Sequence, residues 1–506
     1  MFAKDALNEI EEWRKTNAAH YQLDWRWVER YRKLCAYDTY WWWAQAGPFN
    51  DEEQRQWELL FTSDMDEATK DRLGVLVAQS RARELQAAIA EQREPRLHYP
   101  ALAIEEVRTH ITDLLQLDAE INQQEPNAIV RRLYHEAIDE EVRTLRLIAS
   151  TYEGNNARFW ELTRSLFPEP TREEMEHALF RLIAILKQGL ASPVTREISK
   201  RLVQFIHERL QLSLDLSSSE EKNQELRSTI VSSPSDTEQR VSVQAAKRFF
   251  ETLLHEYEYK DWEVIIDPNA QGARVEQGMR RLFLADSSLS IKAIRHYISH
   301  ELAGHVGRCI AGEHSPVGLL GIHTKNSLEA EEGLAIFYDR QTALLQGQAY
   351  DDTAVWIGTL ATGLASGIVT PPQTFSMLFT FFELFYVIRR IVMCLDADVQ
   401  IATEKARTLA LMRCLRTFRG VPDLKQPGVC FTKDVLYLRG LWRIERALAQ
   451  DDAVLDRLGV GVVALEQLPD LDELGIVAPA QTLRELVVNP RLDVYILSFE
   501  KGGAEA

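Results

Sequence analysis

The sequence has few cysteines, and no two of them stand at a short spacing. The five are scattered over 506 residues: Cys35, Cys309, Cys394, Cys414 and Cys430. An odd and sparse set of this kind fits a reducing compartment better than a disulfide framework. The cysteines therefore predict a cytoplasmic protein.

Positive charge is also scarce. The chain has 58 Lys and Arg against 76 Asp and Glu, a net charge of −18. Because phosphate binding needs a basic surface, we expect no nucleic-acid partner. The first fifteen residues, MFAKDALNEIEEWRK, have acidic side chains where an export signal needs an apolar core, so no export is expected.

Long uncharged apolar runs are absent. The most apolar late segment, FSMLFTFFELFYVIRRIVMCL, contains Glu383, Arg389 and Arg390. These charges would be costly inside a bilayer, so the segment predicts a buried helix and no membrane span.

Most of the chain has helical patterning. Residues 1–95 predict a tryptophan-rich helical extension, in which Trp41, Trp42 and Trp43 spread around a helix and need cover on two sides. Residues 96–215 continue as amphipathic helices, with breaks at YEGNN and FPEPT. The serine-rich residues 216–240 predict a surface loop or a connection between subdomains.

Signals for β-strands are confined to two places. WEVIIDP and ARVEQGMRRLFLA are short runs of β-branched or apolar residues, and LDVYILSFE near the C-terminal end is a plausible further strand. We therefore expect a mainly α protein with a small β-sheet, an α+β fold. Its divisions are predicted at 1–95, 96–215, 216–450 and 451–506, the last an acidic C-terminal extension.

The segment YISHELAGHVGR, from Tyr297, has the residues of a zinc peptidase helix at an unusual spacing. His300 and His305 are five residues apart, as H-E-x-x-x-H, whereas the familiar motif is H-E-x-x-H. On a regular α-helix the two histidines would point about 140° apart. A π-bulge, or unwinding at Gly304, would bring them to one face.

A rival pair of histidines exists. His296 and His300 are four residues apart and would meet on a regular helix. However, only the later pair has a glutamate, Glu301, directly after its first ligand, where a catalytic base is needed. We therefore favour His300 and His305 as zinc ligands, Glu301 as the base, and His296 as an outer partner or core residue.

A catalytic zinc ion needs a third protein ligand. Downstream lies NSLEAEEGLAIFYDRQ, in which Asn326 and Glu329 resemble a capping box. Glu332 is our predicted ligand because Gly333 after it lets another helix approach closely. Glu331 is the alternative, and if Glu332 is the ligand, Glu331→Gln is expected to retain metal and activity. The acids also fit a purely structural role near a helix start.

With these motifs the sequence resembles the microtubule-associated tyrosine carboxypeptidases and their bacterial relatives, the QEGLA-motif proteins. That family pairs H-E-x-x-x-H with [QE]-E-G-[LI]-A, present here as HELAGH and EEGLA. LRTFRGVPDLKQPGVCFTKDVLYLRG resembles the family's R-G…T-K-D…Y-x-x-G block. Similarity to its N-terminal half runs from LHYPALAIEEVRTHITDLL to FWELTRSLFPEPT, so the resemblance covers about residues 96–450.

The resemblance implies a zinc metallopeptidase with one Zn²⁺ per chain, held by His300, His305 and Glu332 beside the base Glu301. It places a gluzincin-like catalytic domain in residues 216–450, wrapped by helices. The implied substrate is the C-terminus of a protein or peptide, with tyrosine or another aromatic residue as an expected product.

Further residues of the third block have predicted roles. Tyr437 is the candidate donor to the oxyanion, and Arg419, Lys433 and Arg439 are candidates to bind the substrate's terminal carboxylate. Each has a structural alternative: packing for the tyrosine and an ion pair for each cation. The strand ARVEQGMRRLFLA is a candidate to hold substrate backbone along an exposed edge.

A second hypothesis is a non-catalytic helical interaction protein with a structural or vestigial zinc site. The presence of Glu301 favours the enzyme, because a structural site needs no base beside an open coordination position.

Overall fold

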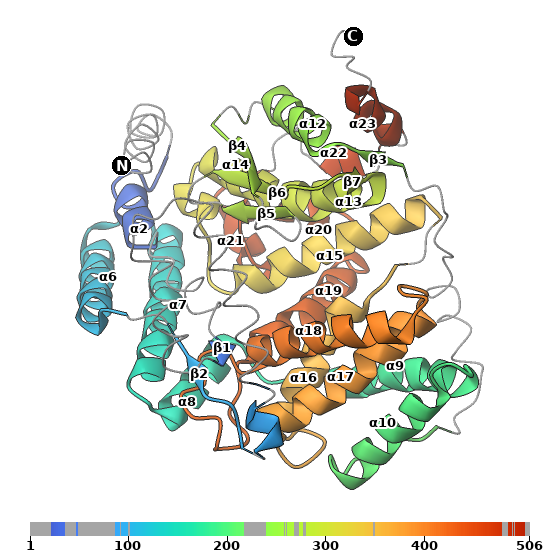
Figure 1. The fold of residues 1–506 in the computed structure, drawn as a ribbon. Coiled ribbons are helices and arrows are strands. Elements are labelled where there is room, and N and C mark those ends of the chain that lie inside the picture. The colour runs from blue at the N-terminus through green and yellow to red at the C-terminus, as the bar shows by residue number, and fades with distance from the viewer. Residues whose placement is uncertain are drawn as a thin grey trace, which may run out of the picture.

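The computed structural model is mainly helical with small sheets, as the sequence predicts (Figure 1). It describes residues 22–35, 47–48, 85–99 except 86 and 92, 102–216, 239–267 except 258 and 260, 273–276, 280–347, 350–477, 484–487, 489 and 491–500. Most of the tryptophan-rich extension, including Trp41 to Trp43, and most of the serine-rich segment lie outside these ranges. Among the described residues, no helix has the length and apolarity to cross a membrane.

Five amphipathic helices follow one another in the first half of the described chain. They are α6 (Ile104–Gln124), α7 (Ala128–Tyr152), α8 (Asn156–Leu166), α9 (Arg172–Ala191) and α10 (Arg196–Glu208). Both predicted breaks are confirmed. Gly154, with φ +69°, follows the end of α7, and Thr171 forms a reciprocal capping box with Glu174 at the start of α9.

The predicted central strands form one small sheet. Its order is β4 (Glu263–Asp267), β6 (Arg281–Ala285), β5 (Ala273–Glu276), with β6 parallel to β4 and antiparallel to β5. Since β6 is paired on both sides, only the β5 part of ARVEQGMRRLFLA lies at an edge, which corrects the proposed substrate-binding strand. Two further pairs are short: β1 (Gly47–Pro48) with β2 (Leu97–His98), and β3 (Arg240–Val241) with β7 (Leu289–Ser290).

The histidine motif lies in a continuous helical stretch after the sheet. In order, it consists of α13 (Ile291–His296), the π-helix η2 (Tyr297–Val306) and α14 (Gly307–Glu313). Arg308 of α14 is buried and donates hydrogen bonds to three carbonyls of the 458–463 segment. The short helix η3 (Gly318–Gly321) then leads to α15 (Ser327–Leu345).

Five helices follow α15 along the chain: α16 (Thr353–Ser366), α17 (Phe375–Val392), α18 (Val399–Thr417), η4 (Thr432–Val435) and α19 (Leu436–Leu448). The expectation of a buried helix is confirmed, because Phe375, Phe381 and Phe382 of α17 are fully buried. Its charges are paired at the margin of the core: Glu383 accepts from Arg407, and Arg390 pairs with Asp396.

The C-terminal part contains α20 (Val454–Leu458), η5 (Leu465–Gln467), α21 (Leu468–Glu473), α22 (Arg484–Val487) and α23 (Leu492–Glu500). The prediction of a strand at LDVYILSFE is therefore wrong, because this segment forms the helix α23. Leu492, Ile496 and Phe499 are buried at helical spacing. Phe499 packs edge-on against Phe249 of α12 (Val243–Glu256), with ring centroids 5.6 Å apart.

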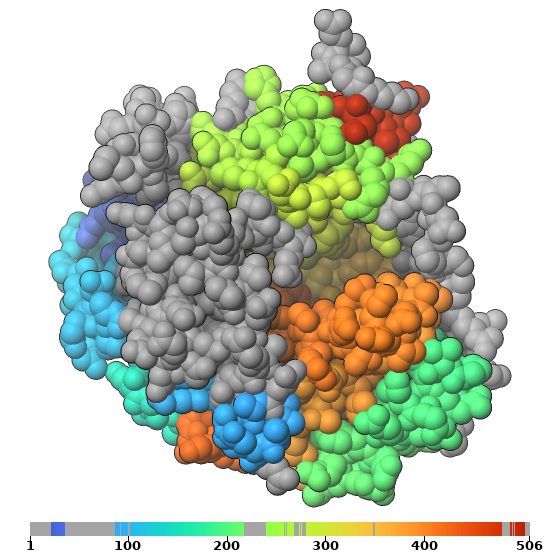
Figure 2. All heavy atoms as spheres, viewed as in Figure 1, coloured from blue at the N-terminus to red at the C-terminus, as the bar shows by residue number. Residues whose placement is uncertain are grey.

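Helix α15 lies between two parts of the molecule. Above it in Figure 1 are the sheet and α13, and below it are α16 to α19. Figure 2 shows this face hollowed between the α13 side and α18, with atoms in the colour of α15 set deeper. The hollow therefore leads toward the helix against which η2 packs.

Candidate metal centre

The helix that carries the motif histidines is a π-helix. It spans ten residues, Tyr297–Val306, and the N–H of Gly307 continues its pattern by bonding to the carbonyl of Leu302, five residues earlier. The wider turn confirms the predicted i to i+5 pattern, although over a longer stretch than one bulge. The rings of His300 and His305 consequently lie near each other, with centroids 5.2 Å apart.

Two glycines allow the close helix packing around the motif. A Cβ on Gly304 would lie 2.7 Å from the Cβ of Ala335, so this glycine lets η2 approach α15. A Cβ on Gly333 would lie 2.3 Å from the carbonyl carbon of Gly440. The predicted close approach at Gly333 is therefore to α19, while the approach to the histidine helix depends on Gly304.

Three predicted zinc ligands come together. One ligand atom from each of His300, His305 and Glu332 lies within 4.8 Å of the other two. A tetrahedral zinc ion with bonds of about 2.0–2.1 Å has its ligand atoms about 3.4 Å apart. Small side-chain adjustments would therefore close this set around one ion.

Carboxylates contact the other nitrogen of each histidine. His305 Nδ1 lies 2.8 Å from Glu331 Oε1, and His300 Nδ1 lies 3.1 Å from Asp339 Oδ2. Ser299 Oγ donates to Asp339 in turn. Zinc-binding histidines commonly have such carboxylate partners, which fix the ring and leave Nε2 for the metal. Glu331 thus contacts a predicted ligand, His305, and lies in the position of an outer partner.

The charges in this cluster stabilise protonated imidazole while no ion is bound. Burial lowers the pKa of His305, but the charge and hydrogen bond of Glu331, together with the charges of Glu332 and Glu301, act in the opposite direction and raise the pKa to about 9. Burial likewise raises the pKa of Asp339, but hydrogen bonds from His296 and His300 lower it to about 2. The site is therefore electronegative and suited to a cation.

His296 occupies an outer position. Its Nδ1 lies 2.9 Å from Asp339 Oδ2, the same oxygen that contacts His300, and its side chain is 49% exposed. His296, His300 and Asp339 also have ligand atoms within 4.8 Å of one another. Because this second set uses the carboxylate that orients His300, it is consistent with the expected outer role of His296.

Two glutamate carboxylates at the site are not paired with another described side chain. Within the described part of the chain, the side chains of Glu301 and Glu332 form no hydrogen bond or ion pair with another residue. Both lie near enough to His305 to raise its pKa. A catalytic zinc site needs one carboxylate as a ligand and another as a base. Glu332 and Glu301, which lie beside the two oriented histidines, fit these two roles.

The candidate oxyanion donor Tyr437 lies in α19, near Glu332. Burial, together with the charge of Glu332, raises the pKa of Tyr437 well above its usual range, so its hydroxyl remains protonated. Arg416 donates to Tyr437 Oη at 3.1 Å and also pairs with Asp434. Sequence reasoning missed Arg416, although Arg413, Arg416 and Arg419 recur every three residues on α18 and just beyond it.

The three predicted carboxylate-binding cations separate into two groups. Burial lowers the pKa of Lys433, while the charge of Glu332 acts in the opposite direction, so Lys433 lies in the electrostatic field of the candidate site. The guanidinium of Arg419 lies 5.9 Å from the ring centroid of Phe431. Arg439, by contrast, forms a two-pronged ion pair with Glu174, with both N–O distances 2.8 Å. This pairing favours the structural alternative for Arg439.

The predicted capping box at the start of α15 is wrong. Asn326 has φ +60° in the left-handed region, and its side chain makes no capping bond. Instead, its backbone N–H donates to Glu140 Oε2 at 2.8 Å, and Glu329 pairs with Arg443. A tertiary hydrogen bond and a tertiary ion pair thus take the place of the local capping interaction.

The chain matches no model of a known protein family, and no curated protein is significantly similar to it in sequence. The resemblance to the tyrosine carboxypeptidases therefore stays a prediction, and the candidate function is argued from the geometry of the site.

The contact between Glu331 and His305 changes the expectation for Glu331→Gln. This variant is expected to bind zinc about 10- to 100-fold more weakly, because the partner that orients the ligand loses its charge. A competition titration with a chelator measures the affinity. Glu329→Gln, on the same helix, is the control and is expected to keep wild-type affinity. Unchanged affinity in Glu331→Gln would contradict an orienting role.

Proposed function

We propose that the protein is a zinc-dependent metallo-carboxypeptidase that hydrolyses the C-terminal peptide bond of a protein or peptide in the cytoplasm. The observation that carries the proposal is the convergence of His300, His305 and Glu332 with an uncommitted Glu301 beside them. Two ligands on one helix and a glutamate on a second helix also support a gluzincin-like core.

The proposed roles follow from the positions of the side chains. A zinc ion at this site supplies a lowered water pKa and a polarised scissile carbonyl. Glu301 takes the proton of the attacking water and transfers it to the leaving amine. Tyr437, which is protonated and lies near Glu332, donates a hydrogen bond to the oxyanion.

Specificity for a free C-terminus requires a cation near the scissile bond. Lys433, on which the charge of Glu332 acts, and Arg419 of the same block are the preferred candidates, and Arg439 pairs with Glu174. Arg416 extends this positive cluster and holds Tyr437. A carboxylate bound there would receive charge-assisted hydrogen bonds. The preference for a tyrosine or another aromatic residue follows from the sequence resemblance alone.

The alternative is a non-catalytic interaction protein with a structural zinc ion. Such a site has no use for a catalytic base next to its ligands. The uncommitted carboxylate of Glu301 next to three potential ligands favours the enzyme.

Zinc analysis of the purified protein, followed by digestion of paired peptides, tests the proposal. The two peptides share a sequence ending in tyrosine, one with a free and one with an amidated C-terminus. We expect loss of the terminal residue from the free peptide only, and no reaction after chelation. Equal cleavage of both peptides would indicate an endopeptidase. A zinc-loaded protein that cleaves neither would support the non-catalytic alternative.

A further inference from the structure

The N-terminal segment is tied to the chain between the histidine helix and α15. Asp24 is fully buried, and its carboxylate accepts hydrogen bonds from the backbone N–H groups of Gly318 and Leu319, at 2.8 and 2.9 Å. Tyr134 of α7 donates to the same carboxylate at 2.8 Å. Three parts of the chain that are distant in sequence therefore meet at this point.

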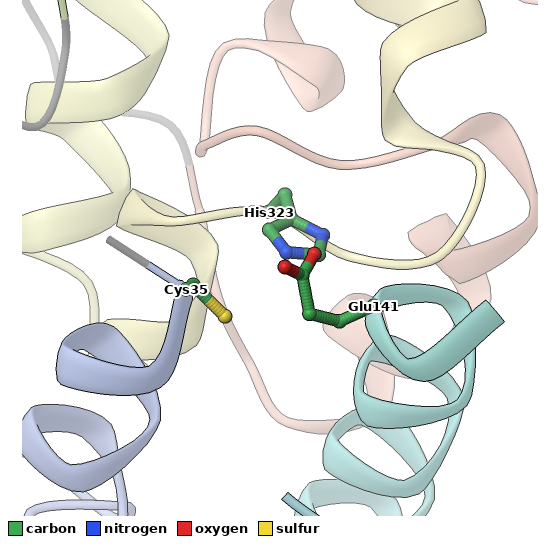
Figure 3. Close-up of side chains that lie close together, drawn as sticks. All are labelled: Cys35, Glu141 and His323. Atoms are coloured by element: carbon green, nitrogen blue, oxygen red, sulfur yellow. The ribbon is translucent and has the colours of Figure 1, made fainter. Parts of the chain in front are cut away.

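A cluster of metal-binding residue types lies at the other end of the same segment. Cys35 is the last residue of α2 (Val28–Cys35), Glu141 belongs to α7, and His323 lies just before α15. Figure 3 shows the three side chains gathered between these elements, with the Glu141 carboxylate against the His323 ring. One ligand atom of each lies within 4.8 Å of the other two.

A fourth residue organises the cluster. Tyr31, one helical turn before Cys35, is fully buried, and its Oη lies 3.0 Å from His323 Nε2. Tyr31 also lies near enough to Cys35 for the two groups to act on each other's pKa. The phenol thus contacts the ring and lies near the sulfur, as the outer partners of metal ligands commonly do.

We propose that Cys35, Glu141 and His323 bind a second Zn²⁺ ion that links α2, α7 and the connection leading to α15. Thiolate, imidazole and carboxylate are all established zinc donors. With the thiolate and the carboxylate bound, the divalent ion gives a site with no net charge, which suits its burial.

The second ion would act on the position of α15. His323 precedes this helix by only a few residues, and Glu332 lies further along it. An ion held by Cys35 and Glu141 would therefore fix the N-terminal end of the helix that carries the predicted third ligand. This linking role does not depend on the proposed peptidase activity.

Cobalt substitution distinguishes the two sites. The full-length protein is stripped of metal and titrated with Co²⁺. A sulfur-to-cobalt charge-transfer band in the near ultraviolet can arise only where a thiolate binds, and His300, His305 and Glu332 provide none. We expect this band in the wild type and in the His300→Ala/His305→Ala variant. We expect it to be absent from Cys35→Ser and retained in the control Cys394→Ser, which changes an exposed thiol.

Zinc content supplies the second measurement. The wild type is expected to hold one more equivalent of zinc than Cys35→Ser, and Glu141→Gln is expected to bind the second equivalent more weakly. Absence of the band from cobalt-loaded wild type would overturn the proposal without reference to any variant's folding. Retention of the band in folded Cys35→Ser would also overturn it. Neither result bears on zinc at His300 and His305.

Discussion

Glu301→Gln is expected to retain stoichiometric zinc at the His300 site and to lose peptidase activity by about 10²- to 10⁴-fold, the usual cost of removing a general base. The side chain forms no hydrogen bond or ion pair with another described residue, so its replacement removes no structural contact there. Glutamine has nearly the same shape but cannot accept the proton of the attacking water. The loss should therefore appear in kcat, with metal binding unchanged.

The measurement combines zinc analysis with steady-state kinetics on a peptide with a free C-terminus. Glu404→Gln is a matched control, because it makes the same change at an exposed position of α18. The control is expected to keep wild-type kcat. If Glu301→Gln instead lost its zinc, Glu301 would be a ligand, and its assignment as the base would fail.

Glu332→Gln is expected to lose both zinc and activity. Glu332 is one of three predicted protein donors within reach of a common ion, so its removal takes away a large share of the coordination free energy. The fall in zinc affinity should exceed the roughly 10- to 100-fold expected when an outer partner such as Glu331 is changed. The order of affinities should be wild type, then Glu331→Gln, then Glu332→Gln.

The double variant His300→Ala/His305→Ala tests the same set from the other helix. It is expected to release the zinc of this site while circular dichroism shows the helical content retained. A chelator competition measured at several pH values adds a further check. Because the pKa of His305 is raised to about 9, protons compete with the metal at neutral pH, so affinity should rise from pH 6 to 9. Full zinc retention by the double variant would refute the ligand assignment.

The features that could be predicted from the sequence are those fixed by local spacing. The five-residue interval between His300 and His305 is incompatible with a regular helix carrying both ligands, and the chain forms a π-helix there. The breaks after α7 and before α9 follow from Gly154 and the Thr171 cap. In each case the backbone preference of a few neighbouring residues determines the outcome.

The errors and omissions involve tertiary partners. LDVYILSFE has residues that suit a strand equally well, and its packing against Phe249 of α12 accompanies the helix. Asp339 contacts His300, and Arg416 contacts Tyr437, each on a different helix. The spacing of residues along the sequence does not predict such contacts between elements. The cluster of Cys35, Glu141 and His323 is likewise visible only after folding, because its members are separated by more than a hundred residues.

The π-helix has a consequence at the level of the gene. Losing the codon for Ala303 would restore an H-E-x-x-H spacing, with the histidines about 40° apart on an ordinary helix. In a π-helix five residues turn through nearly the same angle as four residues of an α-helix, so the side chains after the deletion would face nearly as they do now. Arg308 would still point toward the carbonyls of the 458–463 segment that it now contacts. The loss of a single codon would therefore exchange one motif for the other without turning the rest of the helix.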